Sequence, residues 1–473
     1  MEIFEGQNRN LIINTSCNWD VDVCKGELDY QFSSNERDKK VVVMDLSAID
    51  ESKKSAVLKL VESYHPSHLF IIENDEIPED LLQLKEASIL FKGSYESSLK
   101  AVVQQFKNRK HETWVEFDLK AIAHNLSVFE DKIPEATKTL VMVKASSYGT
   151  GDVQIPHFLQ QYGVDYFGVA YADEGTTLRE HGIHVPILVM NTENDAFGDT
   201  VKFDLEPSLF SMHQLEEFIA FLKQKKITNY PIHLTFETGM NRLGFYQKDI
   251  PDLIKVIQNS PEVQLKSVYS HLADADNTDL DYTKNQIEQF REIRTQFKEA
   301  FTHDILFHIL NSEGTSKFGD TAAFDMVRLG IGVFGYTSTA KQDRLMPFMK
   351  WFTTISQIKA IQPGETIGYG RTYTAEKPMK IAILRIGYAD GFRRSLSNGV
   401  GAVFIDGKAC PVVGNVCMDM TMVDVTDVAC QEGDQVEIIG DNNDMFSFSK
   451  RLKTISYEVM TSINKRVSRV YLK

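Results

Sequence analysis

Cysteine is scarce in this sequence: the chain has five cysteines among 473 residues, and no two of them form a CxxC pair. An odd and scattered set of this kind does not build a disulfide framework, and it lacks the spacing of a zinc site. We therefore expect reduced thiols, a cytoplasmic location and no bound metal. The cysteines are Cys17, Cys24, Cys410, Cys417 and Cys430.

The chain also lacks long apolar runs, an excess of basic charge and a phosphate-binding loop. No apolar stretch approaches the roughly 20 residues that span a membrane. The formal net charge of −15 disfavours nucleic acid and anionic membranes as partners. Residues 1–6 are acidic where a signal peptide would carry a basic region. Because no GxxxxGKS/T motif is present, ATP-dependent ligation is not expected.

What the chain does contain is three segments of different pattern. Residues 1–110 alternate short strands with helices, which predicts a small α/β domain with a parallel sheet. A helix is expected near 95–107, and the polar stretch 107–112 is expected to be a linker. Residues 113–345 contain about eight regular strand–helix units, which is the size of a (β/α)8 barrel of the TIM type.

The first barrel strand is expected at 114–119. A doubly wound open sheet is the alternative architecture, but no GxGxxG motif follows a strand. Residues 346–473 change to short β-branched runs broken by Gly, Pro and Asp, which predicts a C-terminal all-β domain, either a small barrel or a sandwich. One helix is expected near 447–465, before a final strand.

A lysine stands at the end of the second expected barrel strand. The apolar run 139–143 is typical of a buried strand, and Lys144 follows it directly, ahead of the turn-rich stretch 145–151. Such a lysine can simply extend to solvent. If it is desolvated, however, its pKa falls and its neutral amine can form an imine with an aldehyde cofactor.

Cationic and hydroxyl-bearing residues occupy the ends of other expected strands. In a barrel these carboxyl ends meet at one mouth. Each residue alone has an ordinary explanation, such as a core histidine or a surface ion pair. Together they predict a pocket for a phosphorylated cofactor and a carboxylate. The residues are His233, Arg242, His271, His308, Asn311, Ser312 and Arg328.

Five spaced motifs then resemble the signatures of alanine racemase, in the order that this family has, over residues 113–473. The resemblance implies a barrel that binds pyridoxal 5'-phosphate (PLP), a following β domain and a head-to-tail homodimer. It also implies interconversion of L-alanine and D-alanine, which supplies D-alanine for peptidoglycan. The motifs are Val143-Lys144-Ala145 with Tyr148, Gly149 and Gly151; Thr238–Gly244; Gly368–Tyr373; Gly387–Gly391; and Val416–Asp419.

The resemblance assigns the proton transfers to two residues. Lys144 would hold PLP and act on one face of the substrate, and Tyr369 of the partner subunit would act on the opposite face. Arg328 would face the pyridine nitrogen, with His308 orienting it from behind. His271 and Arg328 would assist Tyr369 through hydrogen bonds.

Further residues match binding positions of the family. Arg242 would contact the phenolic oxygen of PLP and the substrate carboxylate, Met418 of the partner subunit would offer its backbone N–H to that carboxylate, and Tyr388 would line the entrance. Asp419 would support this arrangement. The positions that match cofactor binding are Tyr148, Asn311, Ser312, Gly330, Ile331 and Tyr457.

Several residues depart from the family pattern. Thr235 stands where many members carry a lysine, so a bound anion or water would have to take that role beside Arg242. None of the departures removes a proton-transfer group, but they leave open a racemase of broader or different preference, such as serine. A non-catalytic PLP-binding or cell-wall scaffold protein is the alternative of another class. The other departures are Ser146, Glu237 and Asn415.

The N-terminal segment carries a separate resemblance. The stretches 14–20 and 89–94 resemble the C-terminal domain of the Mur ligase that adds D-alanyl-D-alanine to the cell-wall precursor. Residues 1–110 would then be a ligase remnant, as in fused ligase–racemase proteins. The remnant would either contact the racemase or a partner, or act as a folded spacer without an activity of its own.

Overall fold

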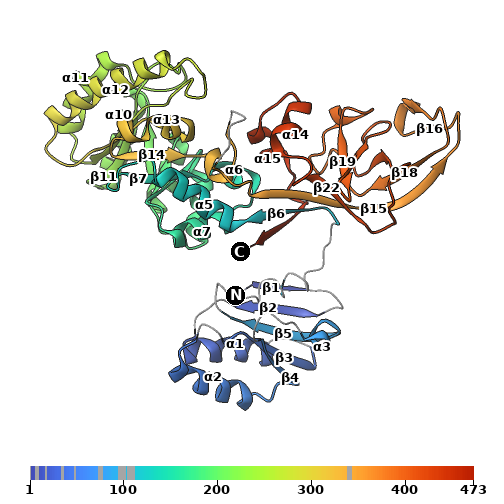
Figure 1. Cartoon of the computed structure of the whole chain (residues 1–473). Helices are drawn as coiled ribbons and strands as arrows, with labels where there is room; N and C mark the ends of the chain where they lie inside the picture. Colours follow the sequence, from blue (N-terminus) through green and yellow to red (C-terminus); the bar gives the residue numbers. More distant parts are fainter. Residues whose placement is uncertain are drawn as a thin grey trace. The chain divides into compact units, whose positions relative to one another are not determined.

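The structure is a computed structural model that describes residues 2–5, 10–15, 19–33, 37–46, 49–72, 78–93, 103, 112–337 and 344–472. The chain divides into two compact units (Figure 1). The first comprises residues 1–111 with 472–473, and the second comprises residues 112–471. Within the described ranges, no helix is both long enough and apolar enough to cross a membrane.

The first unit is an α/β domain, as expected. Its sheet has the order β1-β2-β5-β3-β4, in which β1 is antiparallel to β2 and the other pairs are parallel. The helix expected near 95–107 lies outside the described residues apart from Val103, and most of the linker lies outside them too. The elements are β1 (Glu2–Glu5), β2 (Leu11–Thr15), α1 (Val21–Ser33), β3 (Lys39–Met44), α2 (Glu51–Ser63), β4 (His68–Ile71), α3 (Glu79–Leu82) and β5 (Ala87–Lys92).

Eight parallel strands form the barrel of the second unit. The backbone N–H groups of Asp325 and Arg328 donate to the carbonyl oxygens of Phe307 and Leu310, both at 3.0 Å, and these bonds join the last strand to its neighbour. The strands are β7 (Lys138–Met142), β8 (Tyr166–Val169), β9 (Ile187–Val189), β10 (Glu206–Leu209), β11 (Tyr230–Thr235), β12 (Val263–Tyr269), β13 (Leu306–His308) and β14 (Met326–Leu329).

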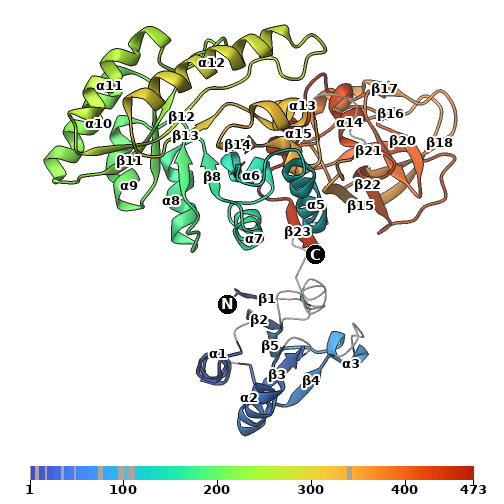
Figure 2. The same ribbon diagram turned by 60° about the vertical axis from the view of Figure 1, so that its left-hand side comes forward.

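Helices surround the barrel on the outside (Figures 1 and 2). Most of them present a buried apolar stripe to the strands, as α5 does with Ile122 and Leu126. The expected TIM-type barrel is therefore confirmed. The helices are α5 (Leu119–Glu130), α7 (Gln154–Tyr162), α8 (Ala172–Glu180), α9 (Phe197–Lys202), α10 (Met212–Lys225), α11 (Ile250–Gln258), α12 (Asp281–Ala300) and α13 (Ser312–Ala322).

The strand expected at 114–119 forms, but it does not belong to the barrel. It is β6 (Trp114–Asp118), which pairs antiparallel with β15 (Met349–Ile361) and also pairs with β23 (Ser468–Leu472). Trp114 packs against Phe352 there, with ring centroids 5.4 Å apart. An alternating pattern predicts a strand but not its partner, so the barrel begins one strand later, and Lys144 follows its first strand.

The C-terminal part of the second unit is an all-β domain with the sheet order β20-β19-β22-β15-β18-β21. The helix expected near 447–465 is instead two helices, α14 (Met445–Arg451) and α15 (Ser456–Ser462), because the chain turns at Lys453 with φ 54°. The remaining strands are β16 (Thr366–Ile367), β17 (Tyr373–Thr374), β18 (Met379–Leu384), β19 (Ala402–Ile405), β20 (Lys408–Pro411), β21 (Thr421–Asp424) and β22 (Gln435–Ile439).

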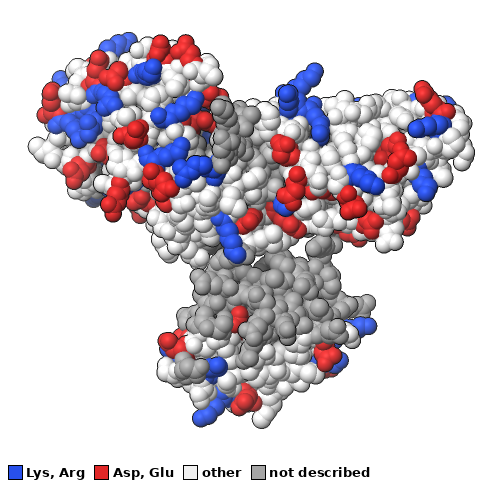
Figure 3. Space-filling model, viewed as in Figure 1, with Lys and Arg blue, Asp and Glu red and all other residues white. Residues whose placement is uncertain are grey.

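Charged side chains of both signs are interspersed on the face of the second unit that Figure 3 shows. Among the described cysteines, Cys24 and Cys410 are buried, Cys417 and Cys430 are half-buried, and all four are free thiols. Cys17 lies outside the described residues.

Candidate active site

A cavity of about 270 Å³ lies at the carboxyl ends of the barrel strands. It includes residues that directly follow β8, β9, β11 and β14, as expected for a barrel of this kind. Tyr457 reaches it from α15 of the β domain. The predicted site residues that line this cavity are Lys144, Tyr148, Arg242, His271, Asn311, Ser312, Arg328, Gly330, Ile331 and Tyr457.

Lys144 is half-buried at the cavity wall. Burial lowers its pKa, the positive charge of Arg242 lowers it further, and the carboxylate of Glu174 acts in the opposite direction. The net effect increases the fraction of neutral amine, which is the form that attacks an aldehyde.

The backbone after Lys144 forms a left-handed helical turn, labelled α6 (Lys144–Gly149). Four consecutive residues that are not glycine, 145–148, have φ between 52° and 59°. This conformation costs an L-residue roughly 1–2 kcal/mol. Distant residues hold the turn. Arg469 donates from Nε and Nη2 to the carbonyl oxygen of Gly149 (3.1 and 3.0 Å). The hydroxyl of Tyr471 donates to the carbonyl oxygen of Thr150 (2.6 Å).

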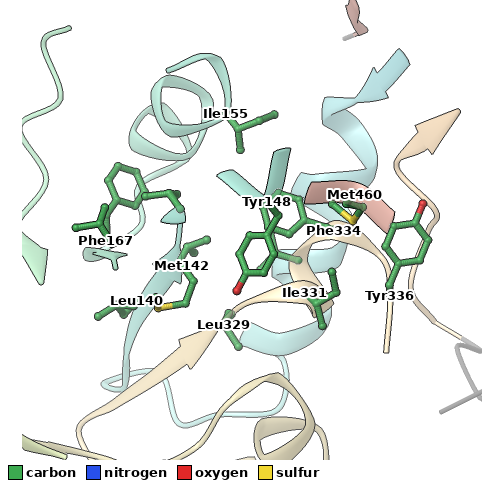
Figure 4. Packing of buried hydrophobic residues seen from close by; sticks show 14 of the residues in the cluster. Leu140, Met142, Tyr148, Ile155, Phe167, Leu329, Ile331, Phe334, Tyr336 and Met460 are labelled. Atoms are coloured by element: carbon green, nitrogen blue, oxygen red, sulfur yellow. The ribbon is translucent and has the colours of Figure 1, made fainter. Parts of the chain in front are cut away.

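Tyr148, at the end of this turn, is buried between the barrel and the β domain. Its ring lies 5.0 Å from that of Phe334 and 6.0 Å from that of Tyr457. Figure 4 shows it close to Phe334, with its hydroxyl directed towards Leu329. Burial raises the pKa of Tyr148, and it raises the pKa of Tyr457 to about 12, so both hydroxyls remain donors at neutral pH.

These hydroxyls lie beside a narrow backbone cradle. The N–H of Gly330 donates to Oγ of Ser312 (2.8 Å), and a Cβ at position 330 would lie only 2.7 Å from the hydroxyl of Tyr148. Ile331 begins the short helix η4 (Ile331–Phe334) and lines the same cavity. Hydroxyl and backbone N–H donors around a space that only glycine leaves open fit the phosphate group of PLP. Asn311 lines the same side and caps α13, accepting from the N–H of Gly314 (2.8 Å).

Arg328 belongs to β14, lines the cavity and is only 3% exposed. Burial lowers its pKa to about 10, which still leaves it protonated at neutral pH. Its guanidinium lies over the ring of Tyr269, 5.0 Å from the centroid. Nη1 donates to Nδ1 and to the carbonyl oxygen of His308 (2.7 and 3.2 Å), and Nη2 donates to Nδ1 of His271 and to the carbonyl oxygens of Ser270 and Ile309 (3.2, 2.5 and 3.3 Å).

His271 is held as a neutral donor. Burial, followed by the charges of Arg328, Arg242 and Lys144, lowers its pKa to about 3. Since Nδ1 accepts from Arg328, the single ring proton of His271 lies on Nε2.

The other predicted residues do not line this cavity. Tyr369, in the turn η5 (Tyr369–Arg371), is 73% exposed, and Met418 and Tyr388 are also exposed on the β domain. His308 accepts at Nδ1 from Nη1 of Arg328 (2.7 Å). Asp419 accepts from Nη2 of Arg466 at 2.7 Å.

The departures from the family pattern have clear contacts. Thr235 lines the cavity, and its hydroxyl is hydrogen bonded to Tyr269. Glu237 holds the next loop by accepting from the backbone N–H groups of Gly239 and Arg242. Asn415 donates from Nδ2 to the carbonyl oxygen of Tyr369 (2.7 Å) and so fixes the backbone of that residue.

Several residues around the site were missed by the sequence reasoning. Tyr269 lines the cavity, and Arg469 and Tyr471 hold the turn after Lys144. The signal that could have identified Tyr269 is its position: it ends β12, two residues before His271. Within the described ranges, no group of three or more His, Cys, Asp or Glu is arranged to hold a metal ion.

Comparisons with known proteins agree with this geometry. The family models described as alanine racemase N-terminal domain and alanine racemase C-terminal domain match residues 117–338 and 348–471. Alanine racemase 2 of Caldanaerobacter subterraneus subsp. tengcongensis is 35% identical over 372 residues, which are 76% of this chain and 95% of that protein.

Solved structures are similar over the same part of the chain. Alanine racemase of Clostridium difficile 630 has a TM-score of 0.72 and 32% identity, covering 76% of this chain and 96% of that one. Alanine racemase of Bartonella henselae with covalently bound pyridoxal phosphate has a TM-score of 0.69 and 28% identity, covering 76% and 99%.

Proposed function

Because the chain belongs to the alanine racemase family, we propose that it binds PLP and interconverts L-alanine and D-alanine, supplying D-alanine for peptidoglycan in the cytoplasm. The observation that carries this proposal is the pairing of Lys144 with the cradle at Gly330. An amine with a lowered pKa and a set of phosphate donors face one cavity.

Lys144 would hold the cofactor covalently. The hydroxyls of Tyr148, Ser312 and Tyr457 and the backbone N–H groups of Gly330 and Ile331 would hold its phosphate, with Asn311 beside them. When bound, PLP withdraws electrons and so acidifies the Cα proton of an amino acid. The Bartonella henselae relative carries this cofactor covalently bound.

Racemisation requires proton transfer on both faces of the substrate, since one base tends to return the proton to the face it came from. Lys144 would act on one face, and Tyr369 of the partner subunit would act on the other. A phenol has an ordinary pKa near 10, so it needs a donor that stabilises its anion. The Nε2–H of His271, oriented by Arg328, is suited to donate to that oxygen.

Arg328 would donate to the pyridine nitrogen without giving up its proton, because a guanidinium remains charged. Arg328 would thereby keep the ring nitrogen unprotonated, which would limit electron withdrawal into the ring and restrain side reactions such as transamination. Arg242, with its backbone held by Glu237, would bind the substrate carboxylate together with the backbone N–H of Met418 of the partner subunit. The carboxylate would thus be fixed from both subunits.

The proposal includes a homodimer, because one chain does not complete the site. Tyr369, Met418 and Tyr388 are exposed on the β domain, and none of them lines the cavity that contains Lys144. A head-to-tail dimer would bring these residues of one subunit to the cavity of the other.

The first experiment is on purified protein supplied with PLP. Borohydride should trap the cofactor on Lys144, and L-alanine in D2O should yield D-alanine labelled at Cα. The Lys144→Ala variant should bind no cofactor covalently. A parallel assay with L-serine ranks the substrates and tests the alternative specificity. Trapped cofactor without turnover of either amino acid would contradict the racemase proposal and favour a PLP-binding protein without catalysis.

For the first unit we propose a folded remnant of a ligase domain without catalytic activity of its own. Its support is the predominantly parallel α/β sheet together with the absence of a GxxxxGKS/T motif from the sequence. The second compact unit comprises residues 112–471. A chain truncated to residues 112–473 should therefore turn over alanine at the rate of the full-length chain.

A further inference from the structure

A chain of hydrogen bonds leads from Arg328 through the interior of the barrel. Nη1 of Arg328 donates to Nδ1 of His308 (2.7 Å), and Nε2 of His308 lies 3.0 Å from Oγ of Ser267. That hydroxyl lies 2.5 Å from Nδ1 of His233, and Nε2 of His233 lies 2.7 Å from Oε2 of Glu206. Glu206 begins β10, so the chain ends at the amino-terminal end of the barrel, opposite the cavity.

The strand register explains why these side chains meet. His233 of β11 pairs with Ser267 of β12, and Tyr269, two residues further on, pairs with His308 of β13. Alternate residues of a strand share a face, and here that face is the barrel interior. The ring of His308 also stacks on that of Tyr269, at 5.0 Å and 11°. Stacking fixes the plane of the imidazole, so that each ring nitrogen has one partner.

With a neutral imidazole at His233, the donors and acceptors permit one order of protons along this series of hydrogen bonds. A guanidinium only donates, so Nδ1 of His308 is an acceptor. Burial, followed by the charge of Arg328, lowers the pKa of His308 well below its usual range, and its single proton therefore lies on Nε2. Ser267 accepts from this N–H and donates its own proton to Nδ1 of His233. The Nε2–H of His233 then donates to Glu206.

The chain also connects a buried cation to an anion. The five hydrogen bonds that Nη1 and Nη2 of Arg328 donate end on two ring nitrogens and three backbone oxygens, and none ends on a carboxylate. A buried charge without a counter-ion is costly. Burial raises the pKa of Glu206, whereas hydrogen bonds from His233 and Tyr166 and the positive charge of Lys266 lower it. The pKa of this carboxyl lies below its ordinary value, so Glu206 is ionised.

We propose that Glu206, His233 and Ser267 are positioning residues for Arg328. Their hydrogen bonds keep the proton of His308 on Nε2, so that Nδ1 accepts from the guanidinium. If Nε2–H loses its acceptor, the buried imidazole has to rotate or change tautomer, and Nη1 of Arg328 then faces an N–H group. The inference rests on the proposed racemase function, in which Arg328 contacts the cofactor, and it adds three residues that do not line the cavity.

The proton order can be measured on the cofactor-free protein. With histidines labelled with 15N, long-range 1H–15N spectra distinguish protonated from unprotonated ring nitrogens. Signals of His233 and His308 are assigned by their loss in His233→Gln and His308→Gln. In the wild type, both rings should carry their proton on Nε2. If the wild type instead carries the proton of His308 on Nδ1, that spectrum alone would overturn the proposal.

Two variants interrupt this series of hydrogen bonds at different points. Ser267→Ala removes the hydroxyl between the two imidazoles, and Glu206→Leu removes the last acceptor while leaving Ser267 and His308 unchanged. Both should alter the ring signals of His308 and lower kcat by roughly tenfold, with a smaller change in KM, because an unpaired buried donor displaces Arg328. Glu206→Gln keeps an acceptor oxygen and should retain the wild-type signals.

The matched control is Ser449→Ala. Ser449 is also buried, and its hydroxyl donates to the carbonyl oxygen of Phe446 (3.0 Å). It lies on α14 and takes no part in the hydrogen bonds between Arg328 and Glu206. It should leave both the ring signals and kcat unchanged. Unchanged signals and turnover in Ser267→Ala and Glu206→Leu would overturn the proposal. If the signals behave as expected but the wild type has no racemase activity, it is the proposed function that fails.

Discussion

His308 is fully buried and neutral, and this couples the stability of the protein to pH. In the unfolded chain its pKa is near 6.5, whereas in the folded protein burial lowers it far below that value. Below about pH 6.5 the unfolded state therefore binds a proton that the folded state does not. The stabilising contribution of this group is complete above that pH and is lost as the pH falls.

The expected result is a difference between His308→Gln and the wild type. Acidification from about pH 7 to about pH 5.5 should lower the free energy of unfolding of the wild type by about 1 kcal/mol more than that of the variant. Urea unfolding of the cofactor-free protein at one protein concentration measures this. His184→Gln, which replaces an exposed histidine, is the control and should keep the wild-type dependence. Equal dependence in His308→Gln and wild type would show that His308 does not remain neutral.

The charged and imidazole side chains of the site could be located from the sequence, whereas their hydrogen-bond partners could not. Lys144, Arg328 and His271 were predicted because strand ends converge in a barrel, and the structure brings them together in one cavity. Ser267 and Glu206 were missed because they are common residue types whose role depends on register between strands. Single-strand periodicity gives the face of a residue, but it does not give the neighbour across the sheet.

At the scale of elements, the left-handed turn α6 is held against α15. Gly149 has φ 81°, and a Cβ there would collide with the backbone oxygen of Met460. In Gly149→Ala, the turn should therefore shift, and the position of Lys144 with it. We expect the affinity for PLP to fall by roughly tenfold to a hundredfold, because a small misplacement of a reacting group has effects of this size.

Gly182→Ala is a closely matched control for this change. Gly182 has a similar φ of 78°, but nothing lies within 4 Å of a Cβ at that position. The Gly182→Ala variant carries only the strain of the left-handed backbone, roughly 1–2 kcal/mol, and should bind PLP like the wild type. Titration of both variants with PLP, followed by absorbance, distinguishes the effect of the lost contact with α15 from the effect of backbone strain. Equal affinities in the two variants would mean that α15 does not hold the turn.

The sequence predicted most elements but not this turn or the position of β6. Stretches 139–143 and 145–151 were expected to be a strand and a loop, and the loop contains glycine only from position 149. A left-handed conformation at residues 145–148 depends on tertiary contacts from Arg469 and Tyr471, more than 300 residues away. Local propensity carries no information about such contacts.

At the scale of the whole molecule, the proposed dimer makes each active site depend on two chains. Lys144 lies in the cavity of the barrel, whereas Tyr369 is exposed on the β domain. Lys144→Ala should abolish activity because it removes the covalent anchor. Tyr369→Phe should retain PLP and suppress turnover of L-alanine, because it removes the group on the opposite face.

A heterodimer of these two variants should recover activity. One of its two sites combines Lys144 of the Tyr369→Phe chain with Tyr369 of the Lys144→Ala chain, and the other site carries both substitutions. Co-expression with two different affinity tags isolates the heterodimer, which should show about half of the wild-type turnover per dimer. The control pairs Lys144→Ala with the double variant and has no intact site. If the first heterodimer is as inactive as this control, both groups act within one chain, and the surface position of Tyr369 would have to change when the cofactor binds.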